Sequence, residues 1–344
     1  MEGNAVLKML KEMCSIPSPS GSEEEMREYI LSRLPEGMPY TIDRMGNLLV
    51  SVKGKKAPAR RLMLAAHMDE VGFIVTGITE EGYLTFTCVG GILPEAIVGR
   101  RVQLGPLTGV IGCKPIHLTS PEERKEYPRT DSLVIDIGAK NKKNAEKLVS
   151  LGDTAVFESG FLEFGDGCIK ARALDDKAGC AVLLDIIRSG KIEYDFTAAF
   201  TVQEEVGCRG AAAAAFGAAP DIAFVLEATT AADLPGVPEQ KQVCRLRCGP
   251  AISFMDGRTV YDRGLYEDLF RVAGRKSIPC QPKAATSGGN DAGEIHKSRE
   301  GVRTAAISMP CRYLHSAVCV IAKEDLFAME SLTIAAANEV LSHD

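Results

Sequence analysis

The amino-acid sequence predicts a three-layer α/β domain that is interrupted by a β-rich insertion. Apolar strands alternate with helical segments at both ends of the chain, which is typical of a sheet covered by helices on its two faces. Between about residues 70 and 165, short β-rich pieces separated by Gly and Pro turns replace that alternation. We therefore expect residues 1–69 and 166–344 to form the α/β domain, and residues 70–165 to form an inserted β-barrel or sandwich.

The segment before the insertion is expected to contribute two helices and three strands. A periodic apolar pattern predicts a helix over residues 5–14, and a capping box formed by Ser22 and Glu25 predicts a second helix that ends near residue 34. The three strands are expected at residues 40–43, 48–52 and 62–66. The last strand is apolar throughout, which is typical of a strand buried on both faces.

The remaining elements follow the same two patterns. Within the insertion, strands are expected at residues 73–78, 83–88, 101–104, 110–113, 133–137 and 155–158. After it, helices are expected at residues 176–189, 209–216, 260–272 and 325–341, and strands at residues 196–202, 222–226 and 304–308. The strands after the insertion are again apolar, so we expect them to join the strand over residues 62–66 in one sheet.

Composition excludes several classes of function. The formal net charge of −6 disfavours a nucleic-acid partner, because phosphate-binding surfaces need a basic excess. No apolar run is long enough to span a bilayer, and the first residues lack the basic region and apolar core of a secretory signal. The 11 cysteines show no CxxC pairing, which indicates reduced thiols. We expect a cytoplasmic protein without a membrane partner.

Polar residues stand where the apolar strands end. His67 follows the strand over residues 62–66, and Asp69 lies two residues later, so both side chains point to the same face of an extended backbone. A histidine that binds a metal usually donates its other N–H to a carboxylate. The simpler explanation is a surface pair of an imidazole and an acid.

Two pairs of adjacent acids, Asp175–Asp176 and Glu204–Glu205, lie at the ends of predicted elements. Asp176 can cap the helix that follows it, which leaves Asp175 free to project into a crevice. Glu204 and Glu205 follow an apolar strand, where buried carboxylates are costly unless a positive charge neutralises them. An exposed loop is the simpler explanation for the two glutamates.

Two further residues complete the set. Glu227 closes the strand over residues 222–226, and His315 lies in a polar loop after the strand over residues 304–308. Mixed imidazole and carboxylate ligands suit zinc, cobalt or manganese. Two such ions could share one carboxylate and activate a water molecule for attack on a carbonyl. One acid that binds no metal must accept the proton, and the pair Glu204–Glu205 offers both roles.

The sequence resembles the tetrahedral aminopeptidases, a family that includes glutamyl and deblocking aminopeptidases and proteins labelled cellulase M. The resemblance covers essentially the whole chain, and it is carried by motifs in the family's order: AHMDEVG, ALDDKAG, QEEVGCRG, ATTAADLPGV, SGGNDAG and RYLHS. It implies hydrolysis of the N-terminal residue of short peptides. It also implies that the insertion is a dimerisation domain and that dimers assemble into a dodecamer.

The same resemblance implies a role for each selected residue. One metal would be held by His67, Asp175 and Glu227, and the other by Asp175, Glu205 and His315. Glu204 would be the general base, and Asp69 would orient the histidine. Position 227 is commonly Asp in the family, so Glu227 lengthens that ligand by one methylene group.

Three other functions remain open at this point. An N-acyl amino acid amidase or deacylase could use the same dinuclear site. A cellulase is chemically unattractive, because glycosidases normally use two carboxyl groups that bind no metal. A non-catalytic scaffold would keep the fold, but the complete set of acids and histidines argues against it. The sequence leaves open which N-terminal side chain is preferred.

Overall fold

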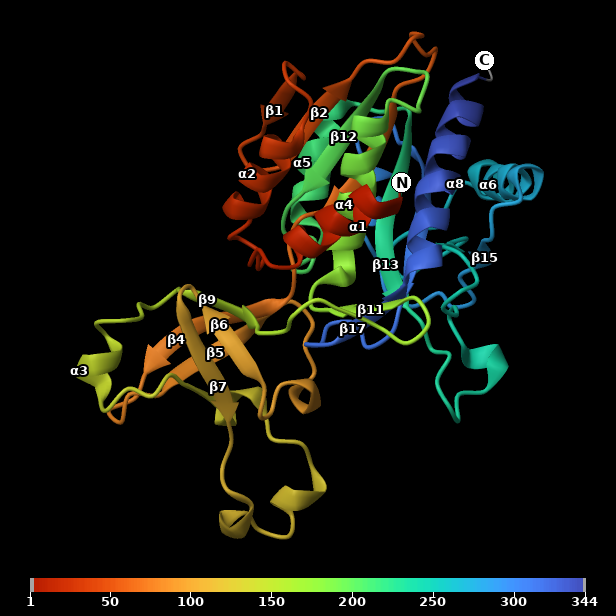
Figure 1. The fold of residues 1–344 in the computed structure, drawn as a ribbon. Helices are drawn as coiled ribbons and strands as arrows, with labels where there is room; N and C mark the ends of the chain where they lie inside the picture. The colour runs from red at the N-terminus through yellow and green to blue at the C-terminus, as the bar shows by residue number, and fades with distance from the viewer. Residues whose placement is uncertain (1–2, 343–344) are drawn as a thin grey trace.

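The α/β domain is built on one eight-stranded sheet, and the computed structural model describes residues 3–342 (Figure 1). The strand order is β1-β2-β12-β3-β13-β16-β14-β15. The bounds are β1 (Tyr40–Ile42), β2 (Leu48–Val52), β12 (Phe196–Thr201), β3 (Leu62–His67), β13 (Ile222–Thr230), β16 (Arg303–Cys311), β14 (Ala251–Ile252) and β15 (Gln281–Pro282). The four central strands, β12, β3, β13 and β16, are parallel, so their carboxyl ends meet at the same edge.

Helices cover both faces of this sheet. The strands alternate in the face that each side chain joins: Leu62 and Leu64 of β3 pack in one core and Met63 in the other. The larger core includes residues of α1 (Gly3–Met13), α2 (Glu24–Arg33), α4 (Leu174–Ser189), α6 (Arg263–Lys276) and α8 (Lys323–Ser342). The smaller core includes residues of α5 (Arg209–Ala218) and α7 (Ala292–Ile295). The predicted three-layer architecture is confirmed.

The β-rich insertion is a closed six-stranded barrel with its own core. Its strands are β4 (Gly72–Ile78), β5 (Leu84–Val89), β6 (Arg101–Leu104), β7 (Leu107–Gly112), β8 (Val134–Asp136) and β9 (Thr154–Phe157). Phe73 lies at the centre, with its ring edge-to-face against Phe86 and Phe157 at 5.4 and 5.1 Å between centroids. The structure thus decides between the barrel and the sandwich that the sequence left open.

Several short elements were not predicted. A three-stranded sheet of β10 (Leu162–Phe164), β11 (Cys168–Ala171) and β17 (Cys319–Ala322) lies between the barrel and α8 (Figure 1). The barrel also carries α3 (Lys142–Ala145). Short 3-10 helices lie at Pro94–Ala96, Ile116–Leu118, Glu123–Lys125, Thr130–Ser132 and Glu239–Lys241. These segments are too short to produce a periodic pattern.

The predicted capping box of α2 is wrong. The residue at the N-cap is Glu23, and its side chain does not cap the helix. Instead, its Oε1 atom accepts hydrogen bonds from the main-chain N–H groups of Gly21 and Gln203 at 2.8 and 3.2 Å. Glu23 thus links the segment before α2 to the turn after β12. Within residues 3–342, no helix has the length and apolar character that crossing a membrane requires.

Candidate metal centre

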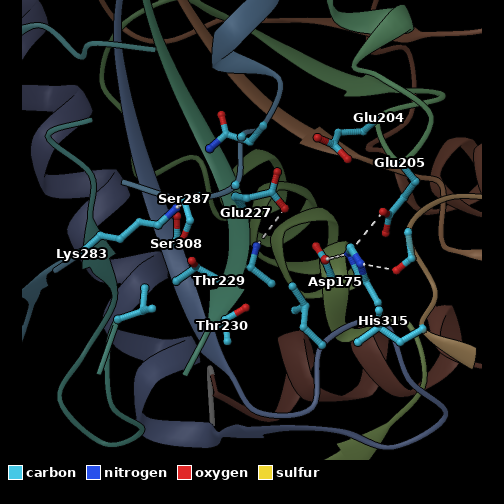
Figure 2. A pocket seen from close by; sticks show the side chains of 18 of the residues that line it. Asp175, Glu204, Glu205, Glu227, Thr229, Thr230, Lys283, Ser287, Ser308 and His315 are labelled. Atoms are coloured by element: carbon cyan, nitrogen blue, oxygen red, sulfur yellow. Dashed lines mark hydrogen bonds and ion pairs between the residues drawn. The ribbon is translucent and has the colours of Figure 1, made fainter. Parts of the chain in front are cut away.

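The selected residues meet at the carboxyl edge of the parallel strands. His67 ends β3, Glu227 lies in β13, and Glu204 and Glu205 lie in the turn after β12. Figure 2 shows Asp175 at the start of α4, with Glu205 and His315 beside it and Glu227 and Glu204 facing the same space. The open crevice at the ends of parallel strands is where α/β proteins form their sites. All seven residues that the sequence analysis selected lie in this cluster.

Asp175 connects the two histidines. Its Oδ1 atom lies 3.3 Å from Nε2 of His67, and its Oδ2 atom lies 3.3 Å from Nε2 of His315. Each imidazole has a second carboxylate as well, at 3.3 Å: Glu227 beside His67, and Glu205 beside His315. We call His67, Asp175 and Glu227 the inner half of the site, and Asp175, Glu205 and His315 the outer half.

These distances fit two divalent cations. Two donor atoms bound to one tetrahedral zinc ion at about 2.0–2.1 Å lie about 3.3–3.4 Å apart. The second oxygens of Glu205 and Glu227 are buried and accept no hydrogen bond from the residues that the structure describes. Native proteins rarely leave buried carboxylate oxygens without a partner. A cation in each half would supply that partner, and the donor set suits one.

The electrostatics of the site also favour positive charge. Burial and the neighbouring charge of Asp175 raise the pKa values of Glu205 and Glu227 well above their usual range. Burial opposes protonation of His67, but the charge of Glu227 and the hydrogen bond to Asp175 raise its pKa well above the usual value. Without a nearby positive charge, the carboxyl groups of Glu205 and Glu227 therefore ionise less readily than usual. A cation placed among them would stabilise their ionised forms.

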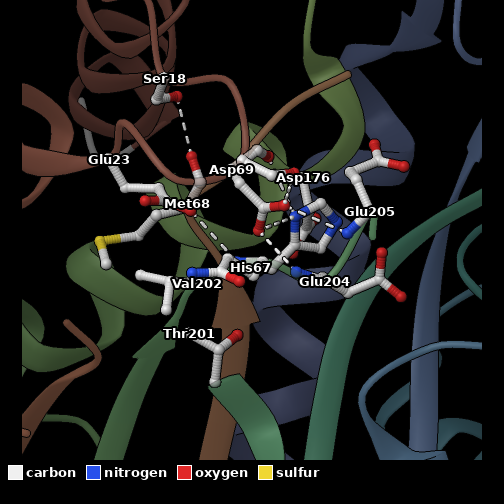
Figure 3. Close-up of polar contacts among 12 residues, drawn as sticks. Ser18, Glu23, His67, Met68, Asp69, Asp176, Thr201, Val202, Glu204 and Glu205 are labelled. Carbon is white, nitrogen blue, oxygen red and sulfur yellow. Dashed lines mark hydrogen bonds and ion pairs between the residues drawn. The ribbon is translucent and has the colours of Figure 1, made fainter. Parts of the chain in front are cut away.

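Asp69 contacts both His67 and the turn that carries Glu204 and Glu205. The main-chain oxygen of Asp69 lies 3.0 Å from Nδ1 of His67, and its carboxylate lies 3.4 Å from the same atom. The carboxylate also accepts hydrogen bonds from the main-chain N–H groups of Glu204 and Glu205 at 2.9 and 3.1 Å (Figure 3). One buried acid therefore fixes the histidine and the turn that carries the two glutamates. The sequence indicated the first contact but not the second.

Glu204 lies in separate surroundings. Its Oε1 atom accepts a hydrogen bond from the Cys208 thiol at 3.2 Å, and burial raises the pKa of the carboxyl group. The carboxyl of Asp291 lies in the same cluster, and burial together with the charge of Glu204 raises its pKa to about 7. Cys208 and Asp291 were not selected from the sequence, although Asp291 belongs to the SGGNDAG motif.

The barrel contributes directly to the outer half. Nδ1 of His315 lies 2.9 Å from the main-chain oxygen of Gly91, in the loop after β5. Because Nε2 faces the carboxylates, Nδ1–H is the donor in this contact. The insertion contributes none of the seven selected residues, but its Gly91 carbonyl orients one of the two histidines.

Two more acids support the inner half. Asp176 accepts a hydrogen bond from the Gly179 N–H at 2.9 Å, which confirms its predicted capping contact, and its carboxylate also lies close to His67 and Glu227. Glu70 is buried, and its carboxylate binds Arg172 at 2.6 Å and Lys177 at 2.7 Å. This ion cluster ties the end of β3 to the first turn of α4, next to Asp175.

The site opens into a cavity of about 370 Å³. Asp175, Glu204, Glu205, Glu227 and His315 line one part of it (Figure 2). The other part is lined by polar residues that the sequence did not single out: Thr229, Thr230, Lys283, Ser287, Asn290 and Ser308. A cavity of this size accommodates an amino-acid side chain and the start of a peptide.

Residues 46–332 match the family model described as M42 glutamyl aminopeptidase. The chain belongs to this family. It is therefore a peptidase, and the resemblance stated from the motifs is confirmed.

Three individual proteins illustrate the relationship. A putative aminopeptidase of Acetivibrio thermocellus is 36% identical over 330 residues, which cover 95% of this chain and 96% of the relative. A lysyl aminopeptidase of Pyrococcus furiosus is 31% identical over 90% of both chains. The solved structure of a Pyrococcus horikoshii TET1 peptidase, which can assemble into a tetrahedron or a large octahedral shell, has a TM-score of 0.86 at 36% identity and covers 97% of this chain and 99% of that one.

Proposed function

We propose that the protein is a dinuclear metallo-aminopeptidase that removes the N-terminal residue of short peptides. The observation that carries the proposal is the position of Asp175, whose two carboxylate oxygens each face one imidazole at 3.3 Å. A carboxylate that bridges two cations needs this arrangement, whereas one surface ion pair needs only half of it. Zinc or cobalt suits the donor set best, and manganese is an alternative.

Each residue of the cluster has one role in this proposal. His67, Asp175 and Glu227 hold the first ion, and Asp175, Glu205 and His315 hold the second. Two divalent ions held there would polarise the scissile carbonyl and lower the pKa of a water molecule. Among the described residues, Glu204 forms no ion pair with either histidine, so we assign its carboxylate the role of taking a proton from that water and giving it to the leaving amine.

The choice of substrate and the dependence on metal distinguish the aminopeptidase from the alternative functions. We expect activity on leucyl-nitroanilide to disappear after chelation and to return with zinc or cobalt, with two ions bound per chain. N-acetyl-leucyl-nitroanilide should remain uncleaved, since an aminopeptidase needs the free amine. Cleavage of the blocked substrate alone would favour the amidase. Full activity in metal-free protein would exclude the dinuclear mechanism, and two bound ions without any hydrolysis would favour the scaffold.

The proposal extends to assembly and location. Large apolar side chains are exposed on the barrel loop after β7, among them Ile116, Leu118 and Tyr127. Exposed apolar groups of this kind are typical of subunit interfaces, which supports dimerisation through the barrel and a dodecamer built from dimers. The 11 cysteines all lie within the described residues and are all free, which suits the reducing cytoplasm. Light scattering tests the assembly, since a stable, fully active monomer would contradict it.

A further inference from the structure

We propose that Cys208 positions the carboxylate of Glu204, and that Arg258 holds the Cys208 thiol in the orientation that this contact requires. Both are positioning residues, since neither is among the described residues that line the cavity. The inference rests on the proposed function, in which Glu204 is the general base. Cys208 belongs to the QEEVGCRG motif, and the proposed mechanism does not otherwise use it.

The three side chains form a chain of hydrogen bonds with one direction. Nη1 of Arg258 donates to the sulfur of Cys208 at 2.8 Å, and the Cys208 thiol donates to Oε1 of Glu204 at 3.2 Å. A guanidinium group can only donate, so the sulfur accepts from Arg258 and keeps its own proton for Glu204. Among the described residues, no other group donates a hydrogen bond to the Glu204 carboxylate. The thiol therefore fixes one oxygen of the base and leaves the other without such a contact.

Glu204 needs this contact because a neighbouring acid repels it. One carboxylate oxygen of Glu204 and one of Asp291 lie within 4.8 Å of each other and of the Cys208 sulfur. Two ionised carboxylates at this distance repel each other, and the repulsion favours positions of Glu204 away from the cluster. The charge of Arg258 opposes this, because it polarises the thiol toward Glu204. Arg258 thus supplies the cluster with a positive charge of its own.

Arg258 is held in place although the residue is exposed. Its main-chain N–H donates to Oδ1 of the buried Asp256 at 2.8 Å. Its side chain lies against Gly289 and Gly293, where an added Cβ atom would come within 2.7 Å of Arg258 at both positions. A larger residue at either glycine would therefore displace the arginine. The SGGNDAG motif contains both glycines, so it provides the space in which Arg258 reaches Cys208.

The backbone at Cys208 has an unusual conformation. Its φ angle is 56°, in the left-handed region that residues other than glycine seldom adopt. The main-chain N–H groups of Gly207 and Cys208 both donate to the carbonyl oxygen of Glu204 at 2.8 Å, which closes the turn. Backbone strain of this kind is concentrated at functional sites. Here the strained turn places the thiol beside the side chain that lies four residues earlier.

The test measures kcat and KM on leucyl-nitroanilide with both metal sites saturated. Cys208→Ala removes the hydrogen bond to Glu204 and should lower kcat about tenfold, the low end for a contact with a charged group, because a thiol is a weak donor. KM and the number of bound ions should stay unchanged, since Glu204 binds neither substrate nor metal in the proposal. Cys208→Ser keeps a donor and should lie closer to wild type. Equal losses in both variants would contradict a hydrogen bond.

A matched control separates this effect from the loss of a buried thiol. Cys168 is also buried and also accepts a hydrogen bond from an arginine, Arg247 at 3.7 Å, but it lies in β11 and is not among the described residues that line the cavity. Cys168→Ala should keep the wild-type kcat. Arg258→Met should lower kcat, and its combination with Cys208→Ala should lower it by less than the product of the two effects, because both changes break the same chain of contacts.

A further comparison places Cys208→Ala in the Glu204→Gln background. If the cysteine acts through the base, it has no base left to position there, so the second change should lower kcat by less than about twofold. An independent measurement needs no activity. The S–H stretching band of Cys208 is the infrared band that Cys208→Ala lacks, and it should shift to higher frequency in Glu204→Ala, because the thiol loses its acceptor.

The outcomes distinguish this inference from the function on which it rests. If Cys208→Ala keeps the wild-type kcat, or lowers it equally in the wild-type and Glu204→Gln backgrounds, the positioning role is overturned and the aminopeptidase function stands. If Cys208→Ala instead lowers the metal content, the thiol belongs to a metal site and the positioning role is again overturned. If Glu204→Gln itself turns over at the wild-type rate, the proposed base is wrong and the inference fails with it.

Discussion

The inner and outer halves of the candidate site contain the same kinds of residue but are built differently. His67 and Glu227 lie on two central strands of the sheet, and their side chains are 1% and 7% exposed. His315 lies in a loop after β16 with a φ angle of 56°, and its side chain is 33% exposed. Its Nδ1 atom depends on a carbonyl of the barrel. Rigid strands thus fix the inner half, whereas the outer half requires the barrel to be in place.

The largest expected effect comes from the residue that both halves share. Asp175→Asn should weaken both metal sites together and reduce turnover at least as much as the loss of a general base, about 10²–10⁴-fold. His315→Ala should release the outer ion and retain the inner ion better, because the inner half does not use that side chain. Isothermal titration of metal-free protein measures both. Equal and independent losses in the two variants would contradict the bridging role of Asp175.

Glu204 tests whether the base is separate from both halves. Glu204→Gln should keep the fold and both metals but reduce kcat about 10²–10⁴-fold, because Gln is nearly isosteric and accepts no proton. Glu205→Gln should instead lower the metal content of the outer half. Metal analysis and kcat on leucyl-nitroanilide measure the two effects. The reverse pattern would show that the roles of the two glutamates are exchanged.

The ion cluster of Glu70 tests how firmly the inner half is anchored. Glu70→Gln leaves the buried Arg172 and Lys177 without their counter-charge, which should cost about 3–5 kcal/mol in the free energy of unfolding. Glu80→Gln is the matched control, since Glu80 makes an exposed ion pair with Lys142, and it should cost less than about 1 kcal/mol. Denaturant unfolding in the presence of a chelator measures both variants.

The same cluster predicts a dependence on pH. Burial opposes ionisation of Glu70, but Arg172 and Lys177 outweigh it and lower its pKa from 4.5 to about 2. Because the folded state has the lower pKa, the stabilisation is complete above about pH 4.5 and is lost as the pH falls toward about 2. The difference in stability between wild type and Glu70→Gln should therefore shrink over this range. A difference that stays constant down to pH 2 would contradict the assignment.

The smallest expected effect concerns the loop of the barrel that holds the outer half. Gly90 has a φ angle of 85°, and a Cβ atom there would lie 2.8 Å from Val71 and 3.3 Å from the Cβ atom of Glu205. Gly90→Ala should displace this loop and weaken the outer metal about 10–100-fold, the usual cost of losing a residue that supports a ligand. Gly99→Ala is the control, since its φ angle is 73° but no atom lies within 4 Å of the added Cβ. Equal metal affinity in both variants would show that the loop does not support His315.

The sequence was most informative where a chemical group ends a long apolar strand. His67 and Glu227 were found because an abrupt polar residue after continuous apolar residues is visible in one dimension. The resemblance carried by the motifs then implied roles that the residues alone left open, such as which of Glu204 and Glu205 would bind metal. Short exposed strands such as β10 were missed, because their residues carry neither alternation nor burial.

What the sequence determined by itself is the inventory of the site: the histidines, the acids and their places at the carboxyl ends of parallel strands. Only the tertiary structure decided which groups are paired. The contact between Gly91 and His315 joins residues 224 positions apart, and the cavity is lined by residues from many separate parts of the chain. Such facts leave no local pattern, because a hydrogen bond or the lining of a cavity depends on distance in space and not on spacing along the chain.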